Sequence, residues 1–419
     1  MIELKIDSAR IEQELQHLAS YSDVPKPAVT RILFSEVELQ ARDYIRSLMK
    51  DAGLVIHEDA VGNIFGRWIG TEPDLPAIST GSHIDAIPFS GMYDGTVGVI
   101  GAIEAIRALK NSDFQPARSL EVIMFTSEEP TRFGIGCLGS RAMAGVLSAN
   151  DLQGLRDSDN QSFDTVRQQA GYTDSLDTVI VDKNTYAAFV ELHIEQGSRL
   201  EKSGNNIGIV TAIAAPATLR VVIQGNGGHA GTVLMPERHD ALVAAAEIIL
   251  TVEQSAQSSP SPDAVATVGL CDVYPNAVNS IPSRILLEID IRDIDLVSRD
   301  NMINTIQENI RNCCAKRDLE ADITLLNSNN PSQSGADIIH TITDMSQKLG
   351  YSYQHLVSRA YHDTLFMAEI CPTSMIFVPS ENGYSHRPEE FTSLDEIVKG
   401  VTVLAHTLAE LSTHTQHKG

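Results

Sequence analysis

Apolar and polar positions alternate along the first half of the chain in blocks that predict strands and helices in turn. Residues 6–22 and 35–53 repeat apolar positions at helical spacing, and so does the segment after Asp94. Short apolar runs between polar loops indicate buried strands. The predicted strands lie in VIHEDAVGNIFGRWIG, PAIST, SLEVIMFTSEE and AAFVELHIEQG. This alternation favours an α/β fold with a mainly parallel sheet.

The pattern changes near residue 213. Strand, helix, two strands, helix and strand follow one another, which is the β-α-β-β-α-β order of a compact, ferredoxin-like α+β unit. After residue 328 the chain returns to the strand-and-loop pattern of its first half. We therefore expect one domain formed by residues 1–212 and 329–419, with residues 213–328 inserted into it as a second domain.

The chain is strongly acidic. Among 419 residues, 55 Asp and Glu face 31 Lys and Arg, which gives a net charge of −24. Such a surface repels nucleic acid and anionic membranes, so we expect neither as a partner. No apolar run approaches the roughly 18 residues of a membrane helix, and the N-terminal segment lacks the apolar core of a signal peptide. Five cysteines without a CxxC spacing indicate reduced thiols. These features predict a cytoplasmic protein.

Metal-binding residue types gather where the predicted strands end. They are His83 with Asp85 and Asp94, Glu128 with Glu129, His193, and His386. The ends of parallel strands meet at one edge of a sheet, where α/β folds keep their ligand sites. Nitrogen and carboxylate ligands suit zinc, manganese or cobalt. We expect a metal site with Asp94 as a bridging carboxylate and one of the two adjacent glutamates free to act as a base.

Each of these residues also has an ordinary structural explanation. A histidine at a strand end is commonly a hydrogen-bonded structural residue, Asp-Gly is commonly a turn, and Glu-Glu is commonly solvated. Further along the chain, His229 fits an ordinary loop histidine, and Arg292 fits a salt bridge with Asp290 or Asp293. The coincidence of ligand types at several strand ends is what favours a metal site.

Six segments together resemble the M20-type dinuclear metal amidohydrolases. They are SHIDAIPFSGMYDG, TSEEPTRFG, ELHIEQG, GGHAGT, NSIPSR and NGYSHRPEE, in this order over nearly the whole chain. The resemblance is to the hydantoinase/carbamoylase branch, which includes N-carbamoyl-L-amino-acid hydrolases, allantoate amidohydrolases and ureidoglycolate amidohydrolases. It implies a zinc-exopeptidase-like catalytic domain, a lid and dimerisation domain in the insertion, and a homodimer. It also implies two divalent metal ions per subunit, with manganese favoured over zinc, nickel or cobalt.

The resemblance assigns a role to each candidate. His83 and His193 would bind one metal ion, Glu129 and His386 would bind the other, and Asp94 would bridge the two.

Five further residues would serve the reaction. Glu128 would be the general base, and Asp85 would orient the first metal-binding histidine through its free ring nitrogen. His229 would reach the active site of the partner subunit and stabilise the oxyanion. Asn279 and Arg292 would hold the substrate, because the planar guanidinium of arginine binds a carboxylate through two oxygens at once.

The segment HIEQG points to the substrate class. The amide of Gln196 both donates and accepts hydrogen bonds, which matches a ureido group. EEPTRFGIGCLGSRAMAG and SRAYHDTLFMAEI are similar to ureidoglycolate amidohydrolases rather than to their relatives. Tyr361 would donate a hydrogen bond to a substrate hydroxyl, unless it is simply a packed aromatic residue. His362 would lie close to the metal ions and the substrate without binding metal.

We therefore expect hydrolysis of the linear C–N bond of a ureido or carbamoyl acid. Ureidoglycolate is the favoured substrate, with glyoxylate, ammonia and carbon dioxide as products, in the catabolism of purine and allantoin nitrogen. The alternatives are an N-carbamoyl-L-amino-acid hydrolase, an allantoate amidohydrolase or an N-acyl-amino-acid hydrolase. A binding protein without turnover is disfavoured, because all five ligands and the base are present.

Overall fold

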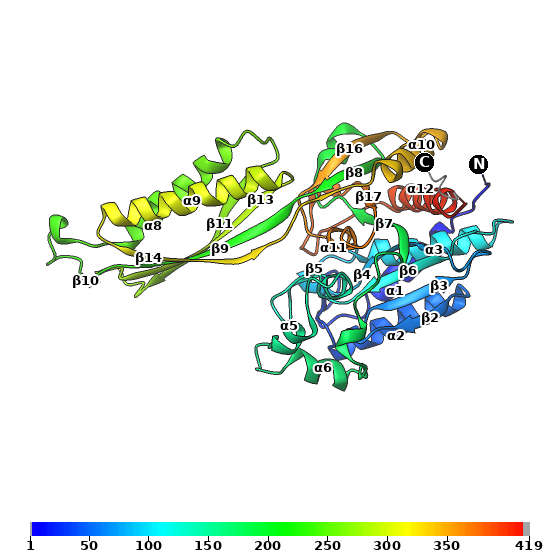
Figure 1. Cartoon of the computed structure of the whole chain (residues 1–419), viewed down its shortest axis with the longest axis horizontal. Coiled ribbons are helices and arrows are strands. Elements are labelled where there is room, and N and C mark those ends of the chain that lie inside the picture. Colours follow the sequence, from blue (N-terminus) through cyan, green and yellow to red (C-terminus); the bar gives the residue numbers. More distant parts are fainter. Residues whose placement is uncertain (1, 414–419) are drawn as a thin grey trace. The chain divides into compact units, whose positions relative to one another are not determined.

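The computed structural model describes residues 2–413. The chain divides into two compact units, residues 1–212 with 333–419 and residues 213–332. In Figure 1 the second unit runs from green to yellow along the chain. The predicted insertion ends at residue 328, where β14 ends, whereas the second unit also includes the linking residues up to Ser332. Within the described residues, no helix has the length and apolarity that a membrane crossing requires.

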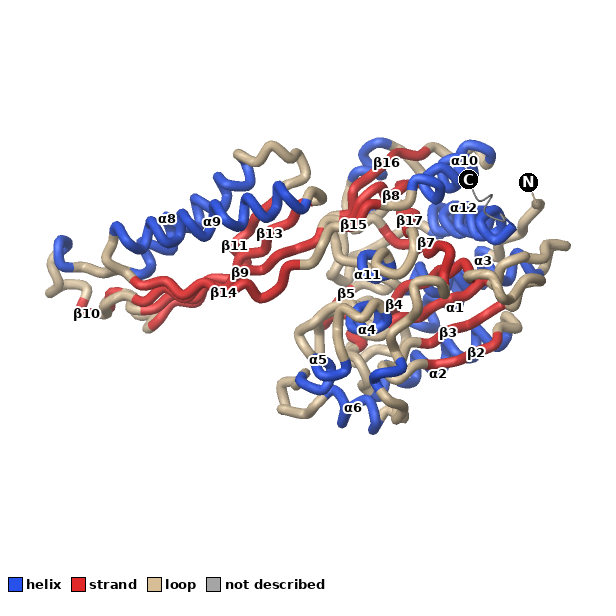
Figure 2. Tube along the Cα trace, in the orientation of Figure 1, coloured by secondary structure: helices blue, strands red, loops and turns tan. Residues whose placement is uncertain are grey.

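A sheet of nine strands is the frame of the first unit (Figure 2). Its order is β15-β8-β17-β7-β4-β6-β3-β2, and β16 pairs with β8 outside this path. The four central strands β17, β7, β4 and β6 run parallel, whereas β8, β3 and β2 pair antiparallel with their neighbours. The strands are β2 (Val55–Glu58), β3 (Ile64–Trp68), β4 (Ala77–His83), β6 (Leu120–Phe125), β7 (Tyr186–Ile194), β8 (Ile207–Ile213), β15 (Ser332–Gln333), β16 (Tyr353–Ser358) and β17 (Thr373–Val378).

The sheet is therefore mixed, with a parallel centre. The predicted parallel arrangement holds for the central strands, which are separated along the chain by long connections. Strands β2 and β3 are antiparallel because only a short turn joins them, and parallel neighbours need a crossover of a dozen residues or more. A separate ribbon pairs β1 (Val29–Arg31) with β5 (Ala86–Ser90).

Helices cover both faces of this sheet. Alternate residues of β7 belong to two different apolar clusters, Val190 and Leu192 to one and Phe189 to the other, as expected of a strand buried on both faces. The helices are α1 (Ser8–Leu18), α2 (Glu36–Asp51), α3 (Thr96–Lys110), α4 (Leu138–Met143), α5 (Ala149–Gly154), α6 (Phe163–Gln169), α7 (Arg199–Ser203), α10 (Ala336–Lys348), α11 (Asp363–Met367) and α12 (Leu394–Thr413).

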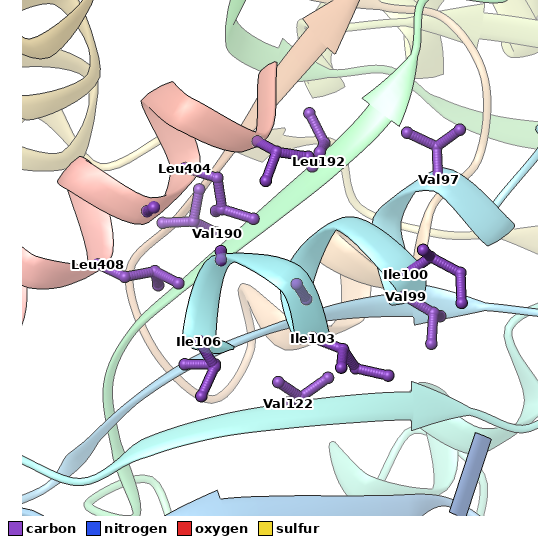
Figure 3. Close-up of a cluster of buried hydrophobic side chains, with 14 of the residues drawn as sticks. Val97, Val99, Ile100, Ile103, Ile106, Val122, Val190, Leu192, Leu404 and Leu408 are labelled. Atoms are coloured by element: carbon purple, nitrogen blue, oxygen red, sulfur yellow. The ribbon is translucent and has the colours of Figure 1, made fainter. Parts of the chain in front are cut away.

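Helix α3 is buried over nearly its whole length. Figure 3 shows Ile103 of α3, Val122 of β6, Val190 of β7 and Leu404 of α12 in one apolar cluster. A helix that is apolar on all sides is suited to such a position between a sheet and another helix. This packing fixes the N-terminal end of α3, which carries Asp94 just before it.

The second unit is a four-stranded antiparallel sheet with two helices. Its order is β11-β13-β9-β14. Alternate residues of β9 and β13 pack against α8 and α9, while Arg220 and Glu288 face away from that core. The elements are β9 (Ala215–Gln224), β10 (Gly228–His229), α8 (Ala241–Gln257), β11 (Val265–Tyr274), β12 (Ser280–Ile281), β13 (Arg284–Asp293), α9 (Leu296–Lys316) and β14 (Glu320–Ser328).

Candidate active site

The central parallel strands end at one edge of the sheet, and the predicted ligands lie there. His83 is the last residue of β4, and His193 lies one residue before the end of β7. Glu128 and Glu129 are in the loop after β6, and His386 is in the loop after β17. Because these four strands are parallel neighbours, their carboxyl ends bring the ligand-bearing segments together.

Asp94 reaches the same place from the turn that precedes α3. Gly95 follows it with a φ of 67°, and a Cβ at this position would lie 2.4 to 2.5 Å from the ring of His83. Glycine is therefore required for this close approach. Asp94 Oδ1 lies 3.2 Å from His193 Nε2 and 3.8 Å from His83 Nε2, whereas Oδ2 lies 3.2 Å from His386 Nε2. The two oxygens of one carboxylate thus face two different sets of side chains.

Two groups of potential metal ligands share this aspartate. They are His83, Asp94 and His193, and Asp94, Glu129 and His386, and within each group the ligand atoms lie within 4.8 Å of one another. His386 Nε2 is 3.4 Å from Glu129 Oε1. The structure therefore brings all five residues that were assigned to the metal ions into one cluster.

The rings of two histidines are oriented by carbonyl groups. Nδ1 of His83 lies 3.1 Å from the carbonyl of Asp85, and Nδ1 of His193 lies 2.9 Å from the carbonyl of Ile194. A carbonyl only accepts, so Nδ1 carries the hydrogen in both rings. Nε2 is then the nitrogen that can bind a cation, and in both rings it faces Asp94. This arrangement fits metal binding.

Asp85 contacts three parts of the site. Its carboxylate lies 3.5 Å from His83 Nδ1, so the nearest contact to that ring is the Asp85 carbonyl rather than the side chain. Asp85 Oδ1 accepts a hydrogen bond from the amide of Glu128 at 3.1 Å, and Oδ2 accepts one from the amide of Glu129 at 3.0 Å. Asp85 therefore orients the tandem glutamates as well as the histidine.

Burial and mutual repulsion control the charges of these groups. Burial, together with the charge of Glu129, raises the pKa of Glu128 well above its usual range. Burial and then Asp94 raise the pKa of Glu129 to about 7. Burial also disfavours the charged form of Asp94, but hydrogen bonds from His193 and His386 hold its pKa well below the usual range. Crowded buried carboxylates favour binding of divalent cations, which compensate the repulsion.

Gln196 contacts the shared aspartate. Its Nε2 donates to Asp94 Oδ2 at 2.9 Å and to Ser385 Oγ at 3.0 Å. Both amide hydrogens are therefore engaged, and Oε1 is the polar atom of this side chain that is left to accept a hydrogen bond. The contact between Gln196 and the substrate stays a prediction, and Oε1 is the atom that would make it.

His362 and Tyr361 lie on the approach to α11. The ring of His362 is 4.6 Å from the ring of His193, and its Nε2 is 3.0 Å from Ser358 Oγ. Burial, and then the charge of His193, holds the pKa of His362 well below its usual value. Tyr361 Oη accepts a hydrogen bond from Arg141 Nη2 at 3.1 Å. His362 thus lies next to a metal ligand, as the sequence suggested, and also belongs to a third potential metal group with Glu191 and His193.

The remaining predicted residues lie in the second unit. His229 pairs with Ser280, and Asn279 accepts a main-chain hydrogen bond from Ala230 at 2.9 Å, so His229 and Asn279 are neighbours. His229 Nδ1 accepts from the amide of Gly231 at 3.1 Å, which leaves the hydrogen on Nε2. Arg292 pairs with Asp290 at 2.7 Å, which is the salt bridge that the sequence allowed as an alternative.

Residues 80–410 match Peptidase family M20/M25/M40. The matched stretch contains all five predicted metal ligands, the tandem glutamates and the whole inserted unit. The chain belongs to this family.

Relatives within the family confirm the predicted resemblance. A ureidoglycolate hydrolase from Arabidopsis thaliana is 51% identical over 418 residues, which cover 98% of this chain and 87% of that protein. An N-carbamoyl-L-amino acid amidohydrolase from Geobacillus stearothermophilus is 36% identical and covers 97% and 99%. Crystal structures of AtUAH in complex with glyoxylate and with (S)-hydroxyglycine each share 51% identity with this chain, cover 98% of both chains and give a TM-score of 0.87.

The sequence reasoning missed several residues that touch the site of this M20 protein, among them Glu390 and Cys137. Glu390 is buried and accepts hydrogen bonds from the amides of Tyr93 and Asp94. Cys137 Sγ lies 3.6 Å from Glu128 Oε1, and its amide donates to the Glu128 carbonyl. Glu390 stands inside NGYSHRPEE and Cys137 inside EEPTRFGIGCLGSRAMAG, but residue type alone does not distinguish Glu390 from its neighbour, and a lone cysteine gives no signal.

Proposed function

We propose that this chain is a metal-dependent amidohydrolase that cleaves the linear C–N bond of ureidoglycolate. The observation that carries the proposal is the position of Asp94, whose two carboxylate oxygens face two ligand groups beside a buried glutamate. The substrate is supported by the Arabidopsis relative, a ureidoglycolate hydrolase at 51% identity.

The residues present fit two divalent cations. His83, His193 and Asp94 would hold one, and Asp94, Glu129 and His386 would hold the other. Such cations supply Lewis acidity and lower the pKa of water at the site. Mixed histidine and carboxylate ligation accepts manganese, zinc, nickel or cobalt, and we propose manganese.

Glu128 is the proposed general base. Its main chain is fixed on both sides, by Asp85 at its amide and by Cys137 at its carbonyl. Its side chain lies 3.8 Å from His83 Nε2. Burial raises the pKa of Glu128, which makes its carboxylate a stronger base, so Glu128 takes the proton from the attacking water and then gives it to the leaving nitrogen.

The products follow from this proton transfer. Water adds to the ureido carbonyl, the C–N bond breaks, and the leaving nitrogen takes the proton from Glu128. The ureido carbon leaves as carbamate, which decomposes to ammonia and carbon dioxide. The remaining hydroxyglycine loses ammonia to give glyoxylate. AtUAH has been crystallised with glyoxylate and with (S)-hydroxyglycine, the two compounds that this sequence of steps would produce.

Substrate contacts in the first unit are proposed for Gln196 and Tyr361. Gln196 Oε1 would accept an N–H of the ureido group, because both hydrogens of the amide nitrogen are engaged by Asp94 and Ser385. Tyr361, whose hydroxyl accepts a hydrogen bond from Arg141 beside α11, would donate a hydrogen bond to a substrate hydroxyl.

Two subunits would share each active site. Arg292 pairs with Pro216 near one end of the second unit's sheet, whereas His229 follows the other end, after Gln224. Arg284 lies at that other end of β13, eight residues before Arg292. The strand rise per residue makes the distance between the two about 27 Å. A small ureido acid cannot span this distance, so we propose that His229 of the partner subunit donates its Nε2 hydrogen to the oxyanion. The neighbouring Asn279 of the partner subunit would then hold the substrate opposite Arg292.

The second unit would therefore act as a dimerisation and lid domain. Leu242, Val243 and Leu250 are exposed on α8, and an apolar surface of this kind is typical of a protein–protein interface.

Turnover of a substrate panel tests the proposed function. Purified, manganese-loaded protein is assayed on ureidoglycolate, allantoate, an N-carbamoyl-L-amino acid and an N-acyl amino acid, with ammonia and glyoxylate measured. We expect the highest kcat/KM for ureidoglycolate and no turnover after metal removal. A higher kcat/KM for an N-carbamoyl-L-amino acid would instead favour the activity of the Geobacillus relative, which is 36% identical. Bound metal without any turnover would favour a binding protein.

A further inference from the structure

Two loops of the first unit meet at the side chain of Glu390. Its Oε1 accepts hydrogen bonds from the amide of Tyr93 at 2.9 Å and from the amide of Asp94 at 3.0 Å. Its Oε2 accepts one from the hydroxyl of Ser385 at 3.0 Å. The residue is only 4% exposed. One carboxylate therefore binds the turn that carries Asp94 and the loop that carries His386.

These contacts form a closed network around the shared aspartate. Ser385 Oγ lies 3.4 Å from Asp94 Oδ2, and Gln196 Nε2 donates to both of these atoms. Glu390 fixes the main chain of Asp94 on one side of this network and the hydroxyl of Ser385 on the other. His386 directly follows Ser385 in the chain.

The backbone around Glu390 is shaped for this approach. A Cβ at Gly91 would lie 2.4 Å from both the Cβ and the Oε1 of Glu390, so a side chain at position 91 would displace the carboxylate. Tyr93 and Phe391 pack edge to face beside it, with ring centroids 5.8 Å apart. The two loops are thus in contact through packing as well as through hydrogen bonds.

The neighbouring glutamate shows that this placement is specific to one residue. Glu389 has a side chain that is 60% exposed and pairs with Arg387 on the surface at 2.9 Å. The two glutamates stand side by side in the chain and carry the same charge, but only Glu390 touches the Asp94 turn among the described contacts.

We propose that Glu390 is a positioning residue that holds Asp94 and His386 at the spacing required by the second metal position. The inference rests on the proposed metal site. His386 depends on this support because it lies in a loop, its own φ is 59°, and its side chain is 49% exposed. His83 and His193 end strands of the sheet and do not need it.

The consequence is an unequal loss of metal affinity. Without Glu390 the Asp94 turn and the His386 loop lose their common anchor, so the position formed by Glu129 and His386 weakens. The position formed by His83 and His193 also uses Asp94, but it keeps both histidines in place and therefore weakens less. Loss of a group that orients metal ligands typically weakens metal affinity about 10- to 100-fold.

Titration calorimetry with MnCl2 on the metal-free, full-length protein tests this proposal. Wild type is expected to bind two equivalents. E390A is expected to bind its first equivalent with little loss of affinity and its second about 10- to 100-fold more weakly than wild type. E390Q is expected to stay within about threefold of wild type, because Oε1 still accepts from both amides and the new amide nitrogen can donate to Ser385. E389A removes the same charge one residue away and is expected to bind like wild type.

Activity at two manganese concentrations separates positioning from general damage. E390A should lose turnover at low manganese and recover most of its kcat at saturating manganese, whereas a merely misfolded variant would not recover. G91A provides a second route if E390A does not fold, because it keeps the carboxylate and displaces it. We expect G91A to weaken the second equivalent in the same way.

Three results would overturn the positioning role. They are two equivalents of wild-type affinity in E390A, an affinity in E390Q as low as in E390A, and wild-type binding by G91A. A wild-type protein that fails to bind two equivalents would count against the proposed metal site itself, so the two failures are distinguishable.

Discussion

The two halves of the metal cluster are built in different ways. His83 and His193 stand at the ends of parallel strands, are buried, and have rings fixed by main-chain carbonyls. Glu129 and His386 stand in loops, and His386 is half exposed. The strand-borne half, His83 and His193, is already formed before a cation arrives. The loop-borne half, Glu129 and His386, depends on the hydrogen bonds that hold its loops. Two neighbouring ligand groups that share one aspartate therefore need not bind a cation with equal affinity.

Removing the residue common to both halves should have the largest effect. Asp94→Ala deletes the carboxylate that faces both ligand groups. We expect both manganese equivalents to weaken by at least about 100-fold, because a shared ligand and the orientation it gives are lost together. Calorimetry and metal analysis after dialysis measure the change. If one equivalent stays at wild-type affinity, Asp94 does not bridge the two halves.

Replacing Glu128, the proposed base, should slow the reaction strongly while leaving both ligand groups in place. Glu128→Gln keeps the size of the side chain and its main-chain hydrogen bonds but cannot take up a proton. We expect kcat to fall about 10²- to 10⁴-fold, the usual contribution of general base catalysis, with two equivalents of metal still bound. Near-normal turnover would mean that another group accepts the proton.

Removing one histidine from each half should separate the two positions. His193→Ala is expected to remove the tighter manganese equivalent, because it opens the strand-borne group. His386→Ala is expected to leave one equivalent at wild-type affinity and to weaken only the second. Calorimetric titrations of the two variants provide the comparison. Equal losses in both would show that the two halves do not differ in the way the structure suggests.

A smaller effect is expected from pH. In the metal-free protein the pKa of Glu129 is raised to about 7 from an ordinary value of 4.5. Its neutral form therefore stabilises the fold at low pH, and this contribution is lost as pH rises through about 7. Bound cations offset the negative charge of ionised Glu129, so they restore this stability. We expect the increase in apparent Tm on adding manganese to grow by a few degrees between pH 5 and pH 8, measured by differential scanning fluorimetry. An increase that does not depend on pH would contradict this view of the loop-borne half.

The strand-borne half and its surroundings were the easier part to predict from the sequence. His83 and His193 follow or close short apolar runs that are typical of buried strands, and parallel strand ends meet at one edge. The inserted unit was visible because its order of strands and helices differs from that of the flanking segments. The antiparallel strands at the sides of the sheet follow from short connections, which the apolar pattern does not distinguish from long ones.

The loop-borne half could not be derived in the same way. The order of residues in SHRPEE does not show which of two adjacent glutamates is buried, and only the fold brings Glu390 against the Asp94 turn. Arg292 illustrates the same limit. Its salt bridge with Asp290 and its proposed role with a substrate carboxylate are both consistent with one strand sequence.

A crystal structure of the manganese-loaded protein, with anomalous scattering recorded for manganese, would show whether Asp94 lies between two cations. We expect two anomalous peaks on opposite sides of the Asp94 carboxylate, one beside His83 and His193 and the other beside Glu129 and His386. A single peak, or peaks away from Asp94, would contradict this expectation.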